Sequence, residues 1–290
     1  MLVDDLYLYA AFAVGWLIGR RWPSRHPWLA RATLGSVGVL LFLLGASFRA
    51  IAPAAIEQVF PLAAAFAATA LVVTAGLSVA LRRRRSVASA PPTPPSVRTR
   101  VGFPSSLLLV LALFVGYGVG RAVALPTATL LTIALAALLA LVGYGVDLSL
   151  ASVRHAWSPL LAATLGSLVT ATFFTVLAGL DPQASFATGL GFGWYSLAGP
   201  LVAARLGATL GLFAFVANLL RELSVMLLAP YLGPRLGGEG LAAMGGATSM
   251  DTNLYFITRY GEEGSAALAL ATGLTLTLAA SLLVPAVLAL

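Results

Sequence analysis

The sequence contains no cysteine and only two histidines, His26 and His155. The lack of cysteine excludes disulfides, thiolate metal sites and thiol redox chemistry. Both histidines lie in basic loops between apolar runs, so we expect no metal centre and no other cofactor. Charge is also scarce, since 9% of the 290 residues are charged and 60% are hydrophobic. This balance excludes a soluble domain and indicates a polytopic membrane protein.

Apolar runs recur along the chain at about 20 residues each, the length that a helix needs to cross a hydrocarbon core of roughly 30 Å. Barrel strands alternate apolar and polar residues, which these runs do not, so the spans are expected to be helical. We therefore expect an all-α polytopic membrane protein with about eight transmembrane helices plus two re-entrant or broken segments; if both segments cross the membrane fully, the count becomes ten. The expected spans are residues 6–19, 32–48, 58–81, 104–123, 127–146, 159–180, 208–232 and 265–289.

The basic residues predict the topology. All 17 are arginines, and most lie in the segments 20–31 and 82–100, whereas the connections on the opposite side carry Arg49 and Arg121 and, in the last third, Arg205. Arginine-rich loops stay in the cytoplasm. We therefore expect an inner-membrane protein with both termini outside and the arginine-rich loops inside. The same distribution argues against nucleic acid as a partner.

Two stretches of the N-terminal part resemble two later stretches. Residues 14–20 (Val-Gly-Trp-Leu-Ile-Gly-Arg) match residues 115–121 (Val-Gly-Tyr-Gly-Val-Gly-Arg), and residues 40–45 match residues 138–143. Because an odd number of spans separates the copies, the second copy is inverted, which is typical of secondary transporters. Chance similarity between apolar helices is the alternative. The expected organisation is a three-helix repeat at 1–81, a cytoplasmic Arg/Pro-rich linker at 82–101, an inverted three-helix repeat at 102–180 and a transport core at 181–290.

Two Gly-rich polar segments interrupt the last third of the chain, one near 189–200 and one near 245–253. Glycine interrupts helical geometry and frees backbone groups to bind a ligand, as in the broken helices of transporters. Irregular backbone at membrane depth is tolerated only inside protein or beside a cavity. A Gly-lined packing face is the alternative for the first segment. The expected structural breaks are Gly191, Gly193, Gly199, Gly245 and Gly246.

Two acidic residues lie in apolar surroundings, Glu222 within a long apolar helix and Asp251 at the end of the second Gly-rich segment. A carboxylate at membrane depth costs a few kcal/mol and by default marks a transport path or a proton relay. The alternatives are an ion pair of Arg221 with an acid and an N-cap role for Asp251 or Ser249. The expected substrate- or ion-binding residues are Glu222, Asp251, Asn218, Ser196, Tyr195, Trp194, Thr248, Ser249 and Asn253.

Three motifs carry a resemblance to a known family. They are Gly-Phe-Gly-Trp-Tyr-Ser-Leu at 191–197, Leu-x-Arg-Glu-Leu at 219–223 and Gly-Gly-Ala-Thr-Ser-Met-Asp at 245–251. In this order they resemble the lysine exporter family, of the LysO type found in prokaryotic inner membranes. The resemblance implies a transporter rather than an enzyme, with L-lysine and toxic lysine analogues as substrates and eight spans with both ends outside.

The resemblance also places the two essential intramembrane acids of that family at Glu222 and Asp251. The family has an acid four residues before the first of these, where this chain has Asn218. This departure leaves the charge of the site, and hence the ion stoichiometry, open.

The chemistry of lysine suggests a mechanism. Glu222 and Asp251 can neutralise two ammonium groups, and free N–H groups beside residues 191–196 can hold the carboxylate. The sequence has no nucleotide-binding motif, so we expect proton antiport in which a carboxylate alternates between lysine and H⁺. A Na⁺-coupled carrier, a channel for a cationic amino acid or other small solute, and a homodimer remain open. The oxygen ligands for Na⁺ would be Thr248, Ser249, Asp251 and Asn253.

Overall fold

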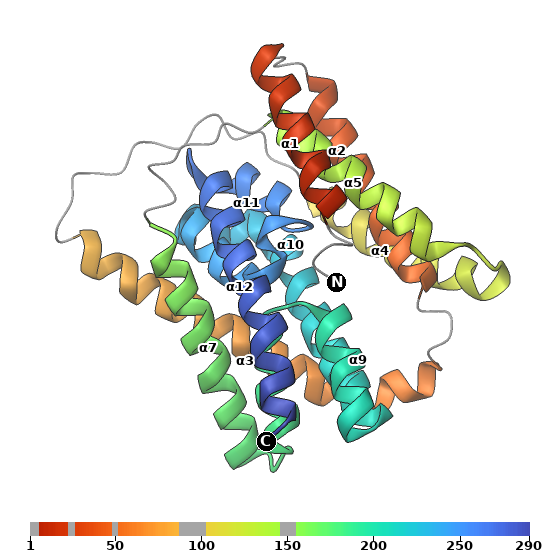
Figure 1. Ribbon diagram of the computed structural model, residues 1–290, viewed down its shortest axis with the longest axis vertical. Helices are drawn as coiled ribbons and strands as arrows, with labels where there is room; N and C mark the ends of the chain where they lie inside the picture. The colour runs from red at the N-terminus through yellow and green to blue at the C-terminus, as the bar shows by residue number, and fades with distance from the viewer. Residues whose placement is uncertain (1–5, 23–26, 48–51, 87–102, 146–154) are drawn as a thin grey trace. The chain divides into compact units, whose positions relative to one another are not determined.

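The computed structural model of the protein describes residues 6–22, 27–47, 52–86, 103–145 and 155–290 (Figure 1). Each regular element in these residues is a helix, which confirms the expected helical class. The chain divides into two compact units, each built from two stretches: Met1–Ala52 with Arg100–Asp147, and Pro53–Thr99 with Leu148–Leu290. These units do not follow the domain boundaries expected from the repeats, because the third helix groups with the C-terminal stretch.

The first unit is a bundle of helices from two separate stretches of the chain (Figure 1). α1 packs along α5 and α2 packs along α4, while α2 also contacts α5. Each helix therefore has its main partner in the other stretch. The bounds are Leu6–Arg21 for α1, Pro27–Ser47 for α2, Phe103–Ala122 for α4 and Thr127–Gly145 for α5.

Glycines let these helices approach closely, as small residues do in membrane bundles. A Cβ added to Gly15 of α1 would lie 2.1 Å from the carbonyl oxygen of Ala140 in α5. A Cβ added to Gly116 of α4 would lie 1.9 Å from the carbonyl oxygen of Phe42 in α2. Further pairs of this kind are Gly19 with Tyr144, Gly120 with Ala46, Gly45 with Leu113 and Gly143 with Phe12.

These glycine contacts link corresponding positions of the two sequence copies. Gly15 and Gly116 occupy the same place in the matching motifs, as do their partners Ala140 and Phe42 in the matching runs. The first helix of each copy thus lies on the second helix of the other copy.

The second unit is centred on α10, which contacts α3, α7, α9, α11 and α12. In Figure 1 α3 and α7 run beside each other, and α12 ends at the C-terminus. The bounds are Pro53–Ser86 for α3, Trp157–Leu177 for α7, Pro182–Leu190 for α8, Tyr195–Leu206 for α9, Ala208–Gly245 for α10, Gly246–Met250 for the 3₁₀ helix η2, Leu254–Tyr260 for α11 and Ser265–Leu288 for α12.

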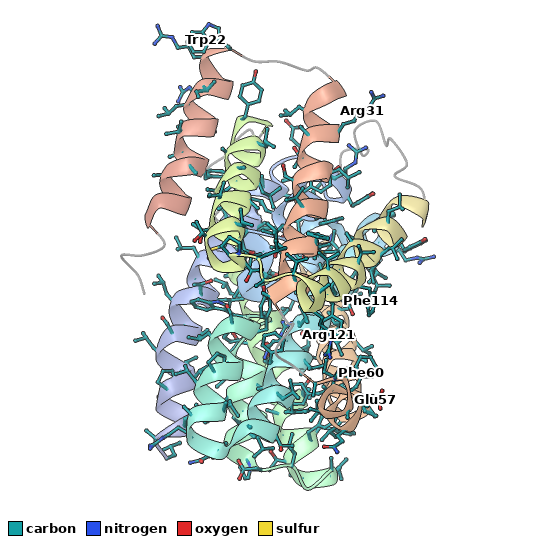
Figure 2. The ribbon with its side chains drawn as sticks, turned by 90° about the vertical axis from the view of Figure 1, so that its right-hand side faces the viewer. Trp22, Arg31, Glu57, Phe60, Phe114 and Arg121 are labelled. Atoms are coloured by element: carbon teal, nitrogen blue, oxygen red, sulfur yellow. The ribbon has the colours of Figure 1, made fainter. Side chains whose placement is uncertain are left out.

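Within the described residues, 4 helices are long and apolar enough to cross a membrane, and all of them belong to the second unit. Large apolar side chains such as Phe114 on α4 and Phe60 on α3 are exposed on the helices that carry them, as Figure 2 shows. Exposed apolar side chains on long apolar helices are what lipid contact requires. The four candidate membrane spans are Pro53–Arg82, Trp157–Leu177, Ala208–Met250 and Ser265–Leu288.

Two helices run further than the sequence indicated. α3 continues to Ser86, so the arginines 82–85 are helical, which corrects the expected start of the linker at residue 82. Arginine is a good helix former and can extend its charge away from an apolar helix surface. α10 continues beyond the expected end at residue 232, but it bends at Gly237 (φ 67°, ψ −174°), so residues 238–245 form a second helical part.

An acid from the next loop holds this bend. The Gly238 N–H, at the start of the second helical part of α10, donates to Oε2 of Glu262 at 2.7 Å. Arg82, near the end of α3, places Nη2 4.0 Å from Oε1 of the same carboxylate. A negative side chain at a helix N-terminus is favourable because it meets unpaired N–H groups and the positive end of the helix dipole.

The glycine contacts of the first unit lead to a prediction. Gly116→Ala forces a Cβ against the Phe42 backbone, so we expect it to destabilise the protein by about 1–3 kcal/mol. Gly118→Ala is the matched control, because nothing lies within 4 Å of a Cβ added there. Alanine also favours helix, so the control should be neutral or more stable by up to about 1 kcal/mol. The midpoint of thermal unfolding in detergent measures both, and equal midpoints would contradict the close approach.

Candidate functional site

The first broken segment lies between α8 and α9. α8 ends at Leu190, α9 begins at Tyr195, and the residues between them have turn conformation with Gly193 at φ 93°. Phe192 has φ 49°, an uncommon value for a residue with a side chain, and is fully buried. Such strained conformations persist only where the surrounding structure enforces them, often at functional sites. The expected breaks at Gly191 and Gly193 are therefore located at this interruption.

The expected break at Gly199 is wrong. Gly199 lies within α9, where a Cβ would come 2.7 Å from the Cβ of Phe215 on α10. A glycine serves equally well for close helix packing and for a break, and the sequence does not separate the two uses.

The second broken segment follows α10. The helix ends at Gly245, Gly246 takes φ 63° and ψ −126°, and the chain continues as η2 to Met250. α11 begins only at Leu254, so Asp251 lies in the turn between the two helices. The expected breaks at Gly245 and Gly246 thus fall where the α-helix gives way to a 3₁₀ helix.

The two broken segments touch through their backbones. The Ala247 N–H donates to the Phe192 carbonyl oxygen at 2.9 Å. A Cβ on Gly246 would lie 2.3 Å from that oxygen, and a Cβ on Gly193 would lie 3.2 Å from the Gly245 carbonyl oxygen. Side chains at these two glycines would separate the segments, so the Gly-rich composition permits the contact.

Asn218 connects α10 to the first broken segment. Its Oδ1 accepts the Gly193 N–H at 2.7 Å, and its Nδ2 donates to the carbonyl oxygens of Thr188 at 3.1 Å and Ala214 at 2.9 Å. Thr188 belongs to the last turn of α8, whose carbonyls lack partners within the helix. The side chain is buried and uses both ends of its amide on backbone groups. Asn218 therefore acts here as a structural bridge.

Glu222, one turn further along α10, is the most deeply buried acid among the described residues, with 1% of its surface exposed. Its Oε2 forms no hydrogen bond with any described residue. Asp251 lies close enough for the two carboxyl groups to repel each other, and Thr252 lies within hydrogen-bonding reach of Glu222. The Thr252 hydroxyl also donates to Oδ1 of Asp251 at 3.1 Å, so the same residue links both acids.

The aromatic end of the first broken segment approaches this acid pair. Tyr195 is within electrostatic reach of both Glu222 and Asp251 and packs edge-on against Phe215, with ring centroids 5.2 Å apart. Trp194 precedes α9 without a side-chain cap for the helix, and Ser196 in its first turn is exposed. The N-terminus of α9 therefore opens beside the carboxyl groups.

The other expected polar residues stabilise the second broken segment. The Thr248 hydroxyl donates to the Gly245 carbonyl oxygen, and the Ser249 hydroxyl lies within reach of the carbonyl oxygens of Gly246 and Ala269. Asn253 donates from Nδ2 to the Thr248 hydroxyl at 2.7 Å. Its Oδ1 is buried and has no hydrogen-bond partner among the residues described.

Arg221 directs its guanidinium to backbone carbonyls in the last turn of α10, just before the second broken segment. Nε donates to the Met244 carbonyl oxygen at 3.0 Å and Nη2 to that of Ala243 at 3.3 Å, while Nη1 donates to the Ser167 hydroxyl on α7 at 3.1 Å. The sequence left open an ion pair with an acid, but these three partners are neutral. The sequence does not predict Thr252 or Ser167 at the site. Thr252 lies in the second Gly-rich segment beside Asp251, whereas Ser167 lies in the apolar helix α7, where no motif marks it.

Comparisons with known proteins agree on one family. The family model described as lysine exporter LysO matches residues 107–288. A curated protein named lysine exporter LysO, from Escherichia coli (strain K12), is 33% identical over 120 residues. This alignment covers 41% of the present chain and 40% of that protein, so the chain spans less than half the length of this relative. No solved structure matches the chain.

The Asn218 bridge gives a prediction. Asn218→Asp keeps an acceptor for Gly193 but loses the donors to Thr188 and Ala214, so we expect a loss of about 1–3 kcal/mol of stability. The control is Thr188→Val, which removes only the hydroxyl that donates to Ala184 within α8 and leaves the Thr188 carbonyl in place. Thermal unfolding in detergent should separate the two variants. An Asn218→Asp protein as stable as Thr188→Val would refute the bridging role.

Proposed function

Because the chain belongs to the lysine exporter LysO family, we propose that it is a secondary transporter that exports L-lysine and lysine analogues across the cytoplasmic membrane. It acts as a carrier and not as an enzyme. The free energy comes from proton antiport through intramembrane carboxyl groups. The observation that carries the proposal is the buried, incompletely paired carboxyl group of Glu222 beside Asp251.

Two neighbouring carboxyl groups in low dielectric repel each other when both are charged, and binding a cation or a proton removes that repulsion. Lysine offers two ammonium groups, and charge-assisted hydrogen bonds to carboxylates are among the strongest that a site can form. When lysine leaves on the outer side, a proton takes its place on Glu222 or Asp251. The acid pair thus binds the two cations in turn, which is the requirement for exchange.

The lysine carboxylate needs a separate partner. Ser196, in the first turn of α9, offers an exposed hydroxyl close to the acid pair through Tyr195, whereas the N–H groups of Trp194, Tyr195 and Leu197 already donate to backbone carbonyls. The dipole of a helix also favours anions near its N-terminus. Lysine would lie with its amines toward Glu222 and Asp251 and its carboxylate toward α9.

Proton exchange also balances the electrical work. Moving a cation outward against a negative interior costs about 2.3 kcal/mol per charge per 100 mV. Inward movement of one proton per lysine cancels this charge movement, and the pH gradient then drives export. A channel would instead let lysine flow only down its own gradient, with no coupling to protons.

The proposed architecture has eight full spans plus the two broken segments, with both termini outside and the arginine-rich loops inside. The mirrored glycine contacts of α1 with α5 and of α4 with α2 support an internal duplication. Copies separated by an odd number of spans have opposite orientation, as in other secondary transporters. The broken segments would then lie inside the membrane, where freed backbone groups must be satisfied by the protein.

Lysine exchange in proteoliposomes tests the role of the acids. Glu222→Gln and Asp251→Asn each remove one charge from the proposed site, and losing one partner of a buried charge pair costs about 2–5 kcal/mol. We therefore expect [¹⁴C]lysine counterflow to fall by roughly 30-fold or more in each variant. Glu263→Gln, which changes an exposed acid before α12, is the control and should transport like the wild type. Full counterflow in both site variants would exclude this mechanism.

A Na⁺-coupled carrier is the second candidate, because Asn253 has a buried Oδ1 without a hydrogen-bond partner among the described residues. Amide, hydroxyl and carboxylate oxygens are suitable ligands for hard cations. The two candidates differ in what drives uptake of lysine into inverted vesicles. Proton antiport predicts uptake driven by a pH gradient without Na⁺, whereas uptake that requires a Na⁺ gradient would favour the second candidate.

A further inference from the structure

We infer that Arg221 is a positioning residue that fixes the last turn of α10, from which the second broken segment continues, and so sets the approach of Asp251 to Glu222. This inference rests on the proposed function only in assigning the two acids to the lysine site. Arg221 itself contacts neither acid in any described interaction. It acts through the backbone that leads to Asp251.

The evidence begins with burial. Arg221 is 3% exposed, and its guanidinium uses Nε, Nη1 and Nη2 on three separate partners. Two are the carbonyl oxygens of Ala243 and Met244, at the end of the second helical part of α10. A buried cation is expensive unless it is well paired. Here its compensation comes from neutral oxygens at a helix C-terminus.

A helix C-terminus is a suitable place for such a charge. Its last carbonyls have no partners within the helix, and its dipole is negative at this end. The planar guanidinium presents several donors in a fixed geometry, so one side chain can bind two successive carbonyls and the Ser167 hydroxyl together. These three hydrogen bonds join the first part of α10, α7 and the end of the second helical part of α10, residues 238–245.

Glu222, the residue after Arg221, links these hydrogen bonds to the acid pair. Successive side chains on a helix point about 100° apart, so Arg221 and Glu222 address different parts of the same broken segment. Arg221 holds Ala243 and Met244, while Glu222 lies near Asp251 after η2. Between Met244 and Asp251, η2 is held by the Ala247 N–H on the Phe192 carbonyl and by the Ser249 hydroxyl beside the Ala269 carbonyl. Fixing Met244 therefore constrains the position of the Asp251 carboxyl relative to Glu222.

The first experiment needs no transport. Because the chain has no cysteine, a single cysteine at Ala247, buried in η2, reports on this segment alone. A buried thiol reacts with N-ethylmaleimide only through local opening. Replacing Arg221 by Met leaves two carbonyls without donors, so we expect labelling of Ala247→Cys to become about tenfold faster or more. A single cysteine at Ala184, buried in α8, is the control and should label at an unchanged rate.

The second experiment measures lysine counterflow. Arg221→Met should raise the KM for lysine by about tenfold or more, because the acids lose their mutual position. Arg221→Lys keeps the positive charge but loses the planar set of guanidinium donors, so its KM should lie between those of the wild type and Arg221→Met. Ser167→Ala removes one of the three bonds and should raise the KM a few-fold. Thr170→Val, in the same helix, removes a hydroxyl that donates only to Gly166 of α7 and should leave the KM unchanged.

These outcomes separate the two ideas. Unchanged labelling at Ala247 in the Arg221→Met protein, or a lowered maximal rate with an unchanged KM, would overturn the positioning role. A wild-type protein that exchanges no lysine would refute the proposed function, and the labelling result would still decide the role of Arg221. If Arg221→Met does not fold, the comparison of Ser167→Ala with Thr170→Val in both assays decides it.

Discussion

The candidate site depends on one requirement, which is that backbone groups freed at two breaks must find partners away from water. A single turn of α10, residues 218–222, provides many of these hydrogen-bond partners. The Asn218 amide forms hydrogen bonds with backbone groups of Gly193 and Thr188 at the first break. The Arg221 guanidinium does the same for the carbonyls of Ala243 and Met244, just before the second break. Unpaired polar groups in hydrocarbon cost several kcal/mol each. The two segments are therefore held by the same short stretch of one helix.

The same turn explains why the acid pair is available for ligands. Asn218 and Arg221 direct their polar atoms to the protein backbone, whereas Glu222 keeps one carboxyl oxygen without a partner among the residues described. Hydrogen bonds to Thr252 orient the two acids without neutralising either of them. A carboxyl oxygen without a partner, held among well-bonded neighbours, favours binding of a small cation or a proton. Under the proposed function, structural and ligand-binding roles are divided between adjacent residues.

Much of the architecture could be predicted from the sequence, because composition decides it: long apolar runs specify membrane helices, and glycine clusters mark most of the breaks. The acids were evident because carboxylates are rare in such surroundings. The role of Asn218 was not, since its partners Gly193 and Thr188 are distant in sequence and bind through backbone atoms that no motif reveals. The sequence also does not show that Gly199 packs against Phe215 within a helix and does not form a break, because Phe215 is distant in sequence. Pairing of α1 with α5 likewise requires knowing which glycine faces which carbonyl.

The bend at Gly237 places a long helical stretch and a half-helix on one continuous chain without a connecting loop. Loops tolerate insertions and deletions, but no loop separates the two helical parts at this junction. One residue added within 238–245 would turn every later helical side chain by about 100°. The distance in sequence from Glu222 to Asp251 should therefore be nearly invariant among functioning relatives.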